Sequence, residues 1–427
     1  MSGVEERPQP APTAEGAKAA PSAPEDSPRQ NSLIRQIMSG SVVRSVLAIV
    51  LAMVIGGLLI AVTNPAVQTA TGYFFQRPGD TFAAAWESIS GAYAALFRGA
   101  IFNYDAPSFI RAIKPITDTL NFATPLIAAG LGVALAFRVG LFNIGARGQM
   151  LVGIIFASVV AFNLQAPLLI HLPLTIIAGL LGGMFWGGLV GFLKARTGAH
   201  EVILTIMLNF VAFYFLSWLL STPGLFQRPG GSQPISPATP ESAQFPLIFA
   251  APLSVNYGFI VVLLAAVFVW WLIERSSLGF RMRAVGENPN AARAAGVNVG
   301  RTIVYAMGIA GALAGLAGVN QISGTITSGY GSHIDAGIGF DAITVALLGR
   351  SRAWGTVGAG LLFGALKAGS FTMQTSQDIP VDIVIVVQAL IVLFIAAPPL
   401  IRSIFFLPKD GSRSPRAAAT ARKEAAA

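Results

Sequence analysis

Ten apolar stretches alternate with polar connections along the chain. They lie at residues 42–62, 118–137, 142–163, 173–193, 202–221, 257–273, 304–322, 338–349, 355–370 and 381–401. A helix that crosses the hydrocarbon core of a bilayer needs about 20 mainly apolar residues, so most of these stretches can span. Stretches 338–349 and 355–370 are short, which predicts helices that are tilted, broken or extended, and a count of nine or ten spans. The pattern predicts an all-α fold, a polytopic membrane helix bundle of about ten spans.

The segments outside the spans differ in character. Residues 1–40 are rich in Pro, Ala, Glu and Ser without apolar periodicity, which predicts a disordered tail. Residues 403–427 predict a basic tail, and 41–402 form one transmembrane domain. In 81–102, large apolar residues recur at helical spacing, which predicts an amphipathic helix on the outer membrane face or against the bundle. The segment 223–256 is rich in Pro, Gly and Ser and predicts an irregular outer loop.

Composition excludes an ordinary soluble protein. Hydrophobic residues make up 54% of the chain and charged residues only 11%, whereas soluble domains hold about a quarter charged residues. The net charge of +9 lies mainly in short connections and the C-terminal tail, and no basic patch is interleaved with stacking aromatics, which argues against nucleic acid. The chain has no cysteine, and His171, His200 and His333 are far apart in sequence, so a metal or redox site is not expected.

The distribution of positive charge predicts the orientation. With the N-terminus inside, eleven Lys and Arg residues fall in the inner connections. The outer connections hold five, all in the two longest loops: Arg77, Arg98, Arg111, Lys114 and Arg228. Because short cytoplasmic loops carry the excess of Lys and Arg, both termini are expected in the cytoplasm.

Enzyme signatures are absent from the sequence. There is no HExxH, no GxSxG and no Gly-Lys dipeptide, so the chain has no P-loop. We therefore expect a transport protein that is not itself an enzyme. Uphill transport would draw on an ion gradient, acting through intramembrane charges, or on a separate ATPase subunit.

Two glycine-rich segments, 140–150 and 323–341, interrupt the apolar pattern at corresponding places. They fall in spans two to five and spans seven to ten, which run in opposite directions and so form two inverted halves. Broken segments at matching positions of inverted halves mark a transport path. The alternative is that the glycines form tight turns and close helix contacts.

Polar side chains near these segments are the candidate substrate-path residues: Asn143, Gln149, Asn209, Asn320, Gln321 and Asp341. Amides donate and accept hydrogen bonds at once, which suits a neutral, hydrogen-bonding solute, although buried amides also hold helices together. The Asp341 carboxylate is costly in lipid, so it either lines the path, locks helices or bonds to nearby backbone amides. Lys367 is near the end of its span and can snorkel.

The longest inner loop, 274–303, contains a short helix with both of its ends encoded. Asn288 can cap it, Pro289 fits the first helical position and Gly296 can adopt the left-handed conformation that ends it. So short a helix is marginal in water, which favours a partner surface over a loop that merely curls.

Four motifs in this chain resemble those of ABC importer permeases, in the nucleoside and simple-sugar branch of the branched-chain type. They are the loop segment 279–298 (GFRMRAVGENPNAARAAGVN), 142–150 (FNIGARGQM), 201–209 (EVILTIMLN) and 337–349 (GIGFDAITVALLG). The resemblance extends over residues 118–401. The resemblance implies that 274–303 is a cytoplasmic coupling loop, in which Glu287, Asn288, Arg293 and Gly296 couple the chain to an ATPase. The wider importer family has Glu where Asn290 stands, a departure that bears on any docking contact needing the acid.

The resemblance also implies the partners. ATPase subunits would bind ATP, so no cofactor is expected in this chain. A second permease subunit, like or unlike this one, would form the path with it, and an extracytoplasmic substrate-binding lipoprotein of the basic-membrane-protein type would deliver the solute. The tail and the outer amphipathic segment resemble the larger of two paired permease subunits, in the inner membrane of a bacterial cell.

The expected function is translocation of a small polar solute by alternating access, driven by separate ATPase subunits. A nucleoside is the expected solute and a simple sugar the alternative. An ion-coupled secondary transporter is the first rival, since inverted halves also fit it. A passive channel or a structural subunit is the second.

Overall fold

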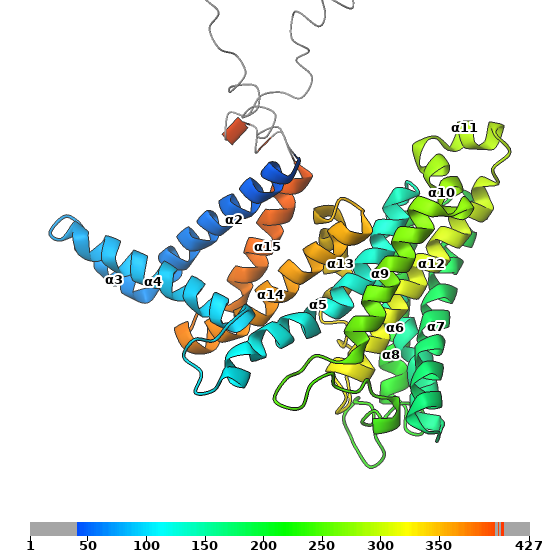
Figure 1. Cartoon of the computed structure of the whole chain (residues 1–427), viewed down its shortest axis with the longest axis horizontal. Helices are drawn as coiled ribbons and strands as arrows, with labels where there is room; N and C mark the ends of the chain where they lie inside the picture. Colours follow the sequence, from blue (N-terminus) through cyan, green and yellow to red (C-terminus); the bar gives the residue numbers. More distant parts are fainter. Residues whose placement is uncertain (1–40, 398–399, 401–402, 405–427) are drawn as a thin grey trace, which may run out of the picture.

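The computed structural model describes residues 41–397, 400, 403 and 404. The expected tail at 1–40 and nearly all of that at 403–427 lie outside these residues. The described part is helical, with irregular connections (Figure 1). Its helices are α2 (Ser41–Thr63), α3 (Pro65–Thr71), α4 (Pro78–Ala100), α5 (Phe109–Arg138), α6 (Ala146–Asn163), α7 (Leu168–Thr197), α8 (Glu201–Ser221), η1 (Glu241–Ala243), α9 (Tyr257–Arg275), α10 (Ser277–Glu287), α11 (Pro289–Ala294), α12 (Val299–Asn320), the π-helical η2 (Gln321–Thr325), α13 (Ile338–Leu348), α14 (Ala353–Gln377) and α15 (Val381–Ala396).

Every predicted apolar span coincides with a helix, which confirms the all-helical membrane bundle. Within the described residues, seven helices are long and apolar enough to cross a membrane, and α13 and α15 are shorter apolar helices. Of the two spans expected to be short, α13 has only 11 residues. The other, α14, has 25, because its helix continues to Gln377 through polar residues.

Close backbone contacts hold the centre of the bundle together. A Cβ at Gly183 of α7 would collide with the Gly311 carbonyl of α12, and a Cβ at Gly187 with the Met307 carbonyl of the same helix. On the other side, Gly360 and Gly364 of α14 bring that helix against α5. In lipid, where burial of apolar surface does not drive helices together, contacts between small residues stabilise such pairs.

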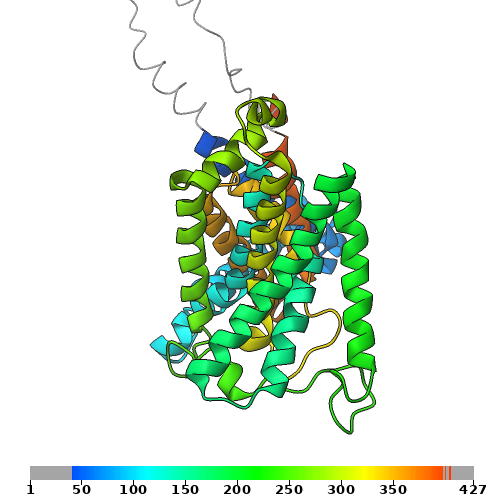
Figure 2. The same ribbon diagram turned by 90° about the vertical axis from the view of Figure 1, so that its right-hand side faces the viewer.

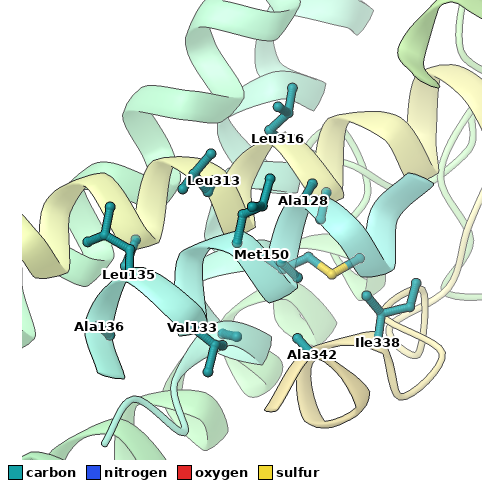
Figure 3. Packing of buried hydrophobic residues seen from close by; sticks show 14 of the residues in the cluster. Ala128, Val133, Leu135, Ala136, Met150, Leu313, Leu316, Ile338 and Ala342 are labelled. Atoms are coloured by element: carbon teal, nitrogen blue, oxygen red, sulfur yellow. The ribbon is translucent and has the colours of Figure 1, made fainter. Parts of the chain in front are cut away.

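The two halves of the bundle pack on each other reciprocally. In each half the third helix packs most extensively against the first helix of the other half: α7 on α12, and α14 on α5. The second helices also contact the first helix of the other half, α6 on α12 and α13 on α5, although α6 packs more extensively on α7 of its own half. This reciprocal packing is what two inverted, interleaved halves require. Figure 3 shows the shared core where Leu135, Met150, Leu313 and Ala342 meet.

Helix α4 lies where the amphipathic segment is expected, and it packs against the bundle over most of its length. Gly99 and Thr372 meet where α4 contacts α14, and the Tyr93 hydroxyl donates to the Met53 carbonyl of α2. The side chains of Phe82 and Trp86 in its first turns are exposed, as is Phe97 near its end. The contacts of α4 with α14 and α2 are those that the second expectation, packing against the bundle, describes.

The two ends of the bundle differ. Helices α10 and α11 project from one end, and the beginning of α2 and the end of α15 lie toward the same end (Figure 1). The long connection between α8 and α9 lies at the opposite end, and its chain covers the segment before α13 through backbone hydrogen bonds such as Ser236 N to Tyr330 O.

Candidate functional site

The two glycine-rich segments meet inside the bundle. The first leads into α6 and the second into α13. The Arg147 Nε atom lies 3.0 Å from Oδ2 of Asp335, and Arg147 Nη2 donates to Oδ1 at 3.2 Å. A Cβ at Gly339 would collide with the Arg147 backbone, so the N-terminal turns of α6 and α13 are in direct contact. Segments that are 188 residues apart in sequence thus form one site.

The length of α13 sets the depth of this contact. Its 11 residues rise about 16 Å, roughly half of the 30 Å hydrocarbon core. Its C-terminal end is fixed at the α10 end of the bundle, where Arg138 Nε donates to the Ser351 carbonyl at 3.0 Å. The N-terminal end of α13, at Gly337, therefore lies inside the bundle, about 16 Å from the C-terminal end of the helix.

The electrostatics of this contact are unusual for a lipid-embedded site. Helix N-termini carry positive partial charge, and neither Gly145 nor Gly337, the capping residues here, supplies a side-chain acceptor. The Arg147 guanidinium adds a full positive charge, and the Asp335 carboxylate, whose side chain is 5% exposed, balances it. Because a charge at this depth is tolerated only when it is paired, each residue requires the other.

Three of the predicted polar residues converge on the first segment. Asn143 and Gln149 are fully buried and exchange hydrogen bonds of 3.1 and 3.3 Å. Asn209 reaches over from α8, where its Oδ1 accepts from Gly148 N at 2.8 Å and its Nδ2 donates to the Ile144 carbonyl at 3.0 Å. These amides satisfy an irregular backbone that would otherwise lack partners in the membrane.

The other three predicted residues lie at different places in the bundle. Gln321 braces the second segment, since its Nε2 donates to the Ile334 carbonyl at 3.0 Å, next to Asp335. Asn320 is 1% exposed and lies elsewhere, against Gly258, and its amide makes no hydrogen bond within the described part of the chain. Asp341 lies in the first turn of α13 and interacts electrostatically with Lys367 of α14.

Several residues of the site are not predicted from the sequence. Arg147 is expected there only as a charge of the inner connections, and Asp335 is not among the candidate residues. An aromatic group adjoins the pair: the guanidinium lies over the Phe213 ring, 5.0 Å from its centroid, and that ring is 5.1 Å from the ring of His333. One sequence signal for the pair was available: the first glycine-rich segment contains a positively charged side chain, and the second contains negatively charged ones.

Helix α11 forms at the predicted place in the inner loop. The Asn288 Oδ1 accepts from the backbone N–H groups of Asn290 and Ala291, both at 3.0 Å, and Gly296 has a φ of +81°. Glu287 and Arg293 are exposed, and Figure 1 shows α11 at the tip of the molecule.

A backbone contact joins this tip to the first glycine-rich segment. Gly286, near the end of α10, lies so close to Arg138 and Val139 that a Cβ there would clash with the Arg138 carbonyl. On the other side of the contact Gly140 has a φ of +75°, a conformation that favours glycine. Movement of α10 therefore bears directly on the chain that leads to Asn143 and Arg147.

The profile of a family described as the permease component of the branched-chain amino acid transport system matches residues 116–396. The chain belongs to this permease family. Its members are transport components of ABC systems, which agrees with a chain that lacks an ATPase signature.

Named relatives narrow the position of this permease within the family. It is 40% identical to the guanosine ABC transporter permease protein NupP of Bacillus subtilis over 74% of this chain and 88% of NupP. It is 36% identical to the nucleoside ABC transporter permease protein NupB of Lactococcus lactis over 71% of this chain and 84% of NupB. It is 35% identical to the glucose ABC transporter permease protein TsgB13 of Haloferax volcanii, over 68% and 77% of the two chains. No solved structure matches the permease.

Proposed function

We propose that this permease imports nucleosides across a bacterial inner membrane by alternating access, with ATP hydrolysis supplied by separate ATPase subunits. Two of the relatives above are named for guanosine and nucleosides, and the greatest of the three identities is to the guanosine permease. A simple sugar is the second candidate, since a relative at 35% identity is named for glucose.

The contact of Gly286 with Arg138 and Val139 carries the mechanical part of the proposal. An ATPase that grips the exposed tip at α11 moves α10, and α10 pushes on the backbone before Gly140. Because packed backbones deform little, the push reaches the N-terminal end of α6 rather than dissipating in side chains. The Arg147–Asp335 pair lies at that end, so the same motion changes how the two halves meet.

The aromatic group beside Arg147 supports a solute with a flat ring. Phe213 is half-buried and His333 is exposed, so their rings border the ion pair on its accessible side. A nucleobase stacks on such rings and its sugar hydroxyls bond to polar groups, whereas a glucose has no π face to stack.

A second permease subunit, identical or different, completes the path in this proposal. Helix α8 packs loosely on the described bundle and exposes an apolar face that includes Met207, Phe210, Tyr214 and Trp218. That face adjoins Phe213, and a second subunit covers it and encloses the solute between the two copies of the site. An extracytoplasmic lipoprotein delivers the solute at the end opposite α11, and both termini are cytoplasmic.

Uptake assays with the reconstituted complex test this function. The permease, its ATPase subunits and the binding lipoprotein are placed in vesicles with radiolabelled guanosine, a pentose or glucose. The proposal predicts ATP-dependent uptake of the nucleoside with little uptake of either sugar. Preferential uptake of glucose would make the sugar, and not the nucleoside, the substrate. Uptake without ATPase subunits would contradict the mechanism.

A further inference from the structure

A large pocket opens at the α10 end of the bundle, away from the site described above. Its volume is about 1090 Å³, and it lies between the ends of α5 and α9, the turn from α13 to α14, and α10. Five arginines and one glutamate line it: Arg138, Arg275, Arg283, Arg350, Arg352 and Glu274. Figure 2 shows α9 (yellow-green) and α8 (green) on opposite sides of the bundle, so this pocket does not belong to the face that α8 presents.

Without counting Arg350, four arginines of the pocket, Arg138, Arg275, Arg283 and Arg352, share one lining acid, Glu274. Glu274 lies 3.5 Å from Arg138, whose Nε is already bonded to the Ser351 carbonyl. The Nη1 atom of Arg283 is buried and has no hydrogen-bond partner within the described residues. A buried guanidinium nitrogen without an acceptor is costly, and an anionic oxygen in the pocket would supply one.

The backbone of the pocket is strained where two of the arginines project. Arg350 and Ser351 are consecutive and both have positive φ, 54° and 52°, although neither is glycine. A non-glycine residue in this conformation costs energy, and two in succession persist only where the surroundings require them. Two backbone hydrogen bonds that end α13 hold this turn, from Arg350 N to the Leu347 carbonyl and from Ser351 N to the Ala346 carbonyl. The turn places Arg350 and Arg352 in the lining of the pocket.

The lower walls of the pocket are apolar. Leu135, Val269 and Ile273 are buried side chains of the spans and lie beneath the arginines. Trp270 and Trp354 border the opening and are exposed, as tryptophans at a membrane interface are. The arrangement combines arginines near the α10 end of the bundle with an apolar wall one turn farther along α5 and α9.

We infer that this pocket binds the head group of an anionic phospholipid, with its phosphodiester between the arginines and an acyl chain against the apolar wall. Arginine forks match phosphate oxygens bidentately, and basic pockets between helices at the cytoplasmic side select such lipids. A soluble phosphate would satisfy the arginines but not the apolar wall. An acidic loop of a partner protein would have to reach below head-group level, beside tryptophans that face lipid.

Quenching of tryptophan fluorescence by brominated lipid tests the site without any transport assay. The full chain is placed in phosphatidylcholine nanodiscs that contain a small fraction of either brominated phosphatidylglycerol or brominated phosphatidylcholine. The glycerol lipid should quench more at equal fraction, because it concentrates next to Trp270 and Trp354. Replacing both of these tryptophans with phenylalanine should remove that difference.

Paired arginine variants locate the binding. Arg275→Gln with Arg352→Gln should weaken the preference for phosphatidylglycerol about fivefold per arginine, on the order of 25-fold together. The matched control, Arg196→Gln with Arg301→Gln, removes the same charge from exposed positions outside the pocket and should keep the wild-type preference. If the double variant does not fold, Arg352→Gln alone should still show its fivefold loss.

Four results would overturn the inference. Equal quenching by the two lipids would show that the pocket does not select the anionic lipid. Equal loss of preference in the pocket variant and its control would leave only bulk attraction. Full displacement of the quenching by soluble glycerophosphate would make the pocket a site for a free phosphate. Loss of the quenching when ATPase subunits bind would assign the arginines to a protein interface.

Discussion

Replacing Gly286 with alanine should uncouple ATP hydrolysis from transport. The new Cβ would lie well within 3 Å of the Arg138 carbonyl oxygen and 3.1 Å from the carbonyl carbons of Arg138 and Val139. Carbon atoms pack at about 3.5–4.0 Å, so α10 and the chain before Gly140 would have to separate by roughly 1 Å. The contact that transmits motion from α11 would then be looser in at least one of the two transport states.

The size of the effect follows from the cost of overpacking. Extra atoms in a well-packed contact cost about 1–3 kcal/mol, and a bias of that size between two states corresponds to a factor of roughly 5–150. The assay measures solute uptake and ATP hydrolysis in the same vesicles, with ATPase subunits and binding lipoprotein present. We expect the solute moved per ATP hydrolysed to fall by at least about fivefold, while membrane insertion and basal hydrolysis persist.

Gly188 provides the matched control. It also lies in a helix, α7, but nothing is within 4 Å of the position its Cβ would occupy, so Gly188→Ala should leave coupling unchanged. If Gly286→Ala transports as efficiently as the wild-type chain while remaining folded, α10 does not transmit force through this contact. Equal losses in both variants would point to a general effect of alanine in the bundle.

Three further predictions concern the Arg147–Asp335 pair, the tip at α11 and the buried amide of Asn209. Arg147→Gln and Asp335→Asn should each destabilise the fold by about 3–5 kcal/mol, and a double-mutant cycle followed by thermal unfolding should show a coupling of about 1–3 kcal/mol; strictly additive effects would contradict the pairing. Arg293→Glu, or deletion of 288–296, should leave insertion intact but abolish uptake in vesicles, and unchanged uptake would remove α11 from the mechanism. Asn209→Leu should lower the melting temperature through a loss of about 2–6 kcal/mol, since two buried backbone groups lose their partners; an unchanged melting temperature would show that water replaces the amide.

The spans could be predicted from the sequence because lipid imposes both length and apolarity on a crossing helix. Local chemistry likewise encodes α11, whose cap at Asn288 and left-handed end at Gly296 act on neighbouring residues. The end of α14 could not be predicted this way. Its last turn carries exposed polar residues, of which Gln377 contacts Gly91 of α4, so hydropathy ends the span before the helix ends.

The candidate site was only partly predictable. The glycine-rich segments and the amides at Asn143, Gln149 and Asn209 follow from the need to satisfy an irregular backbone in the membrane. The partnership of Arg147 with Asp335 depends on how two halves of the chain interleave, which no local pattern reveals. Helix α10 was expected as loop because its sequence has little apolar character. It packs chiefly on α9 and α12, where Gly279, Met282 and Val285 are buried, and this packing explains why it forms.

In the proposed mechanism, this chain takes force at α11 from a partner that hydrolyses ATP. The most direct measurement compares uptake by the purified chain alone, under an imposed proton or sodium gradient, with uptake by the complex supplied with ATP. We expect accumulation of solute only with ATPase subunits and ATP. Accumulation of solute by the chain alone, driven by the ion gradient, would contradict it.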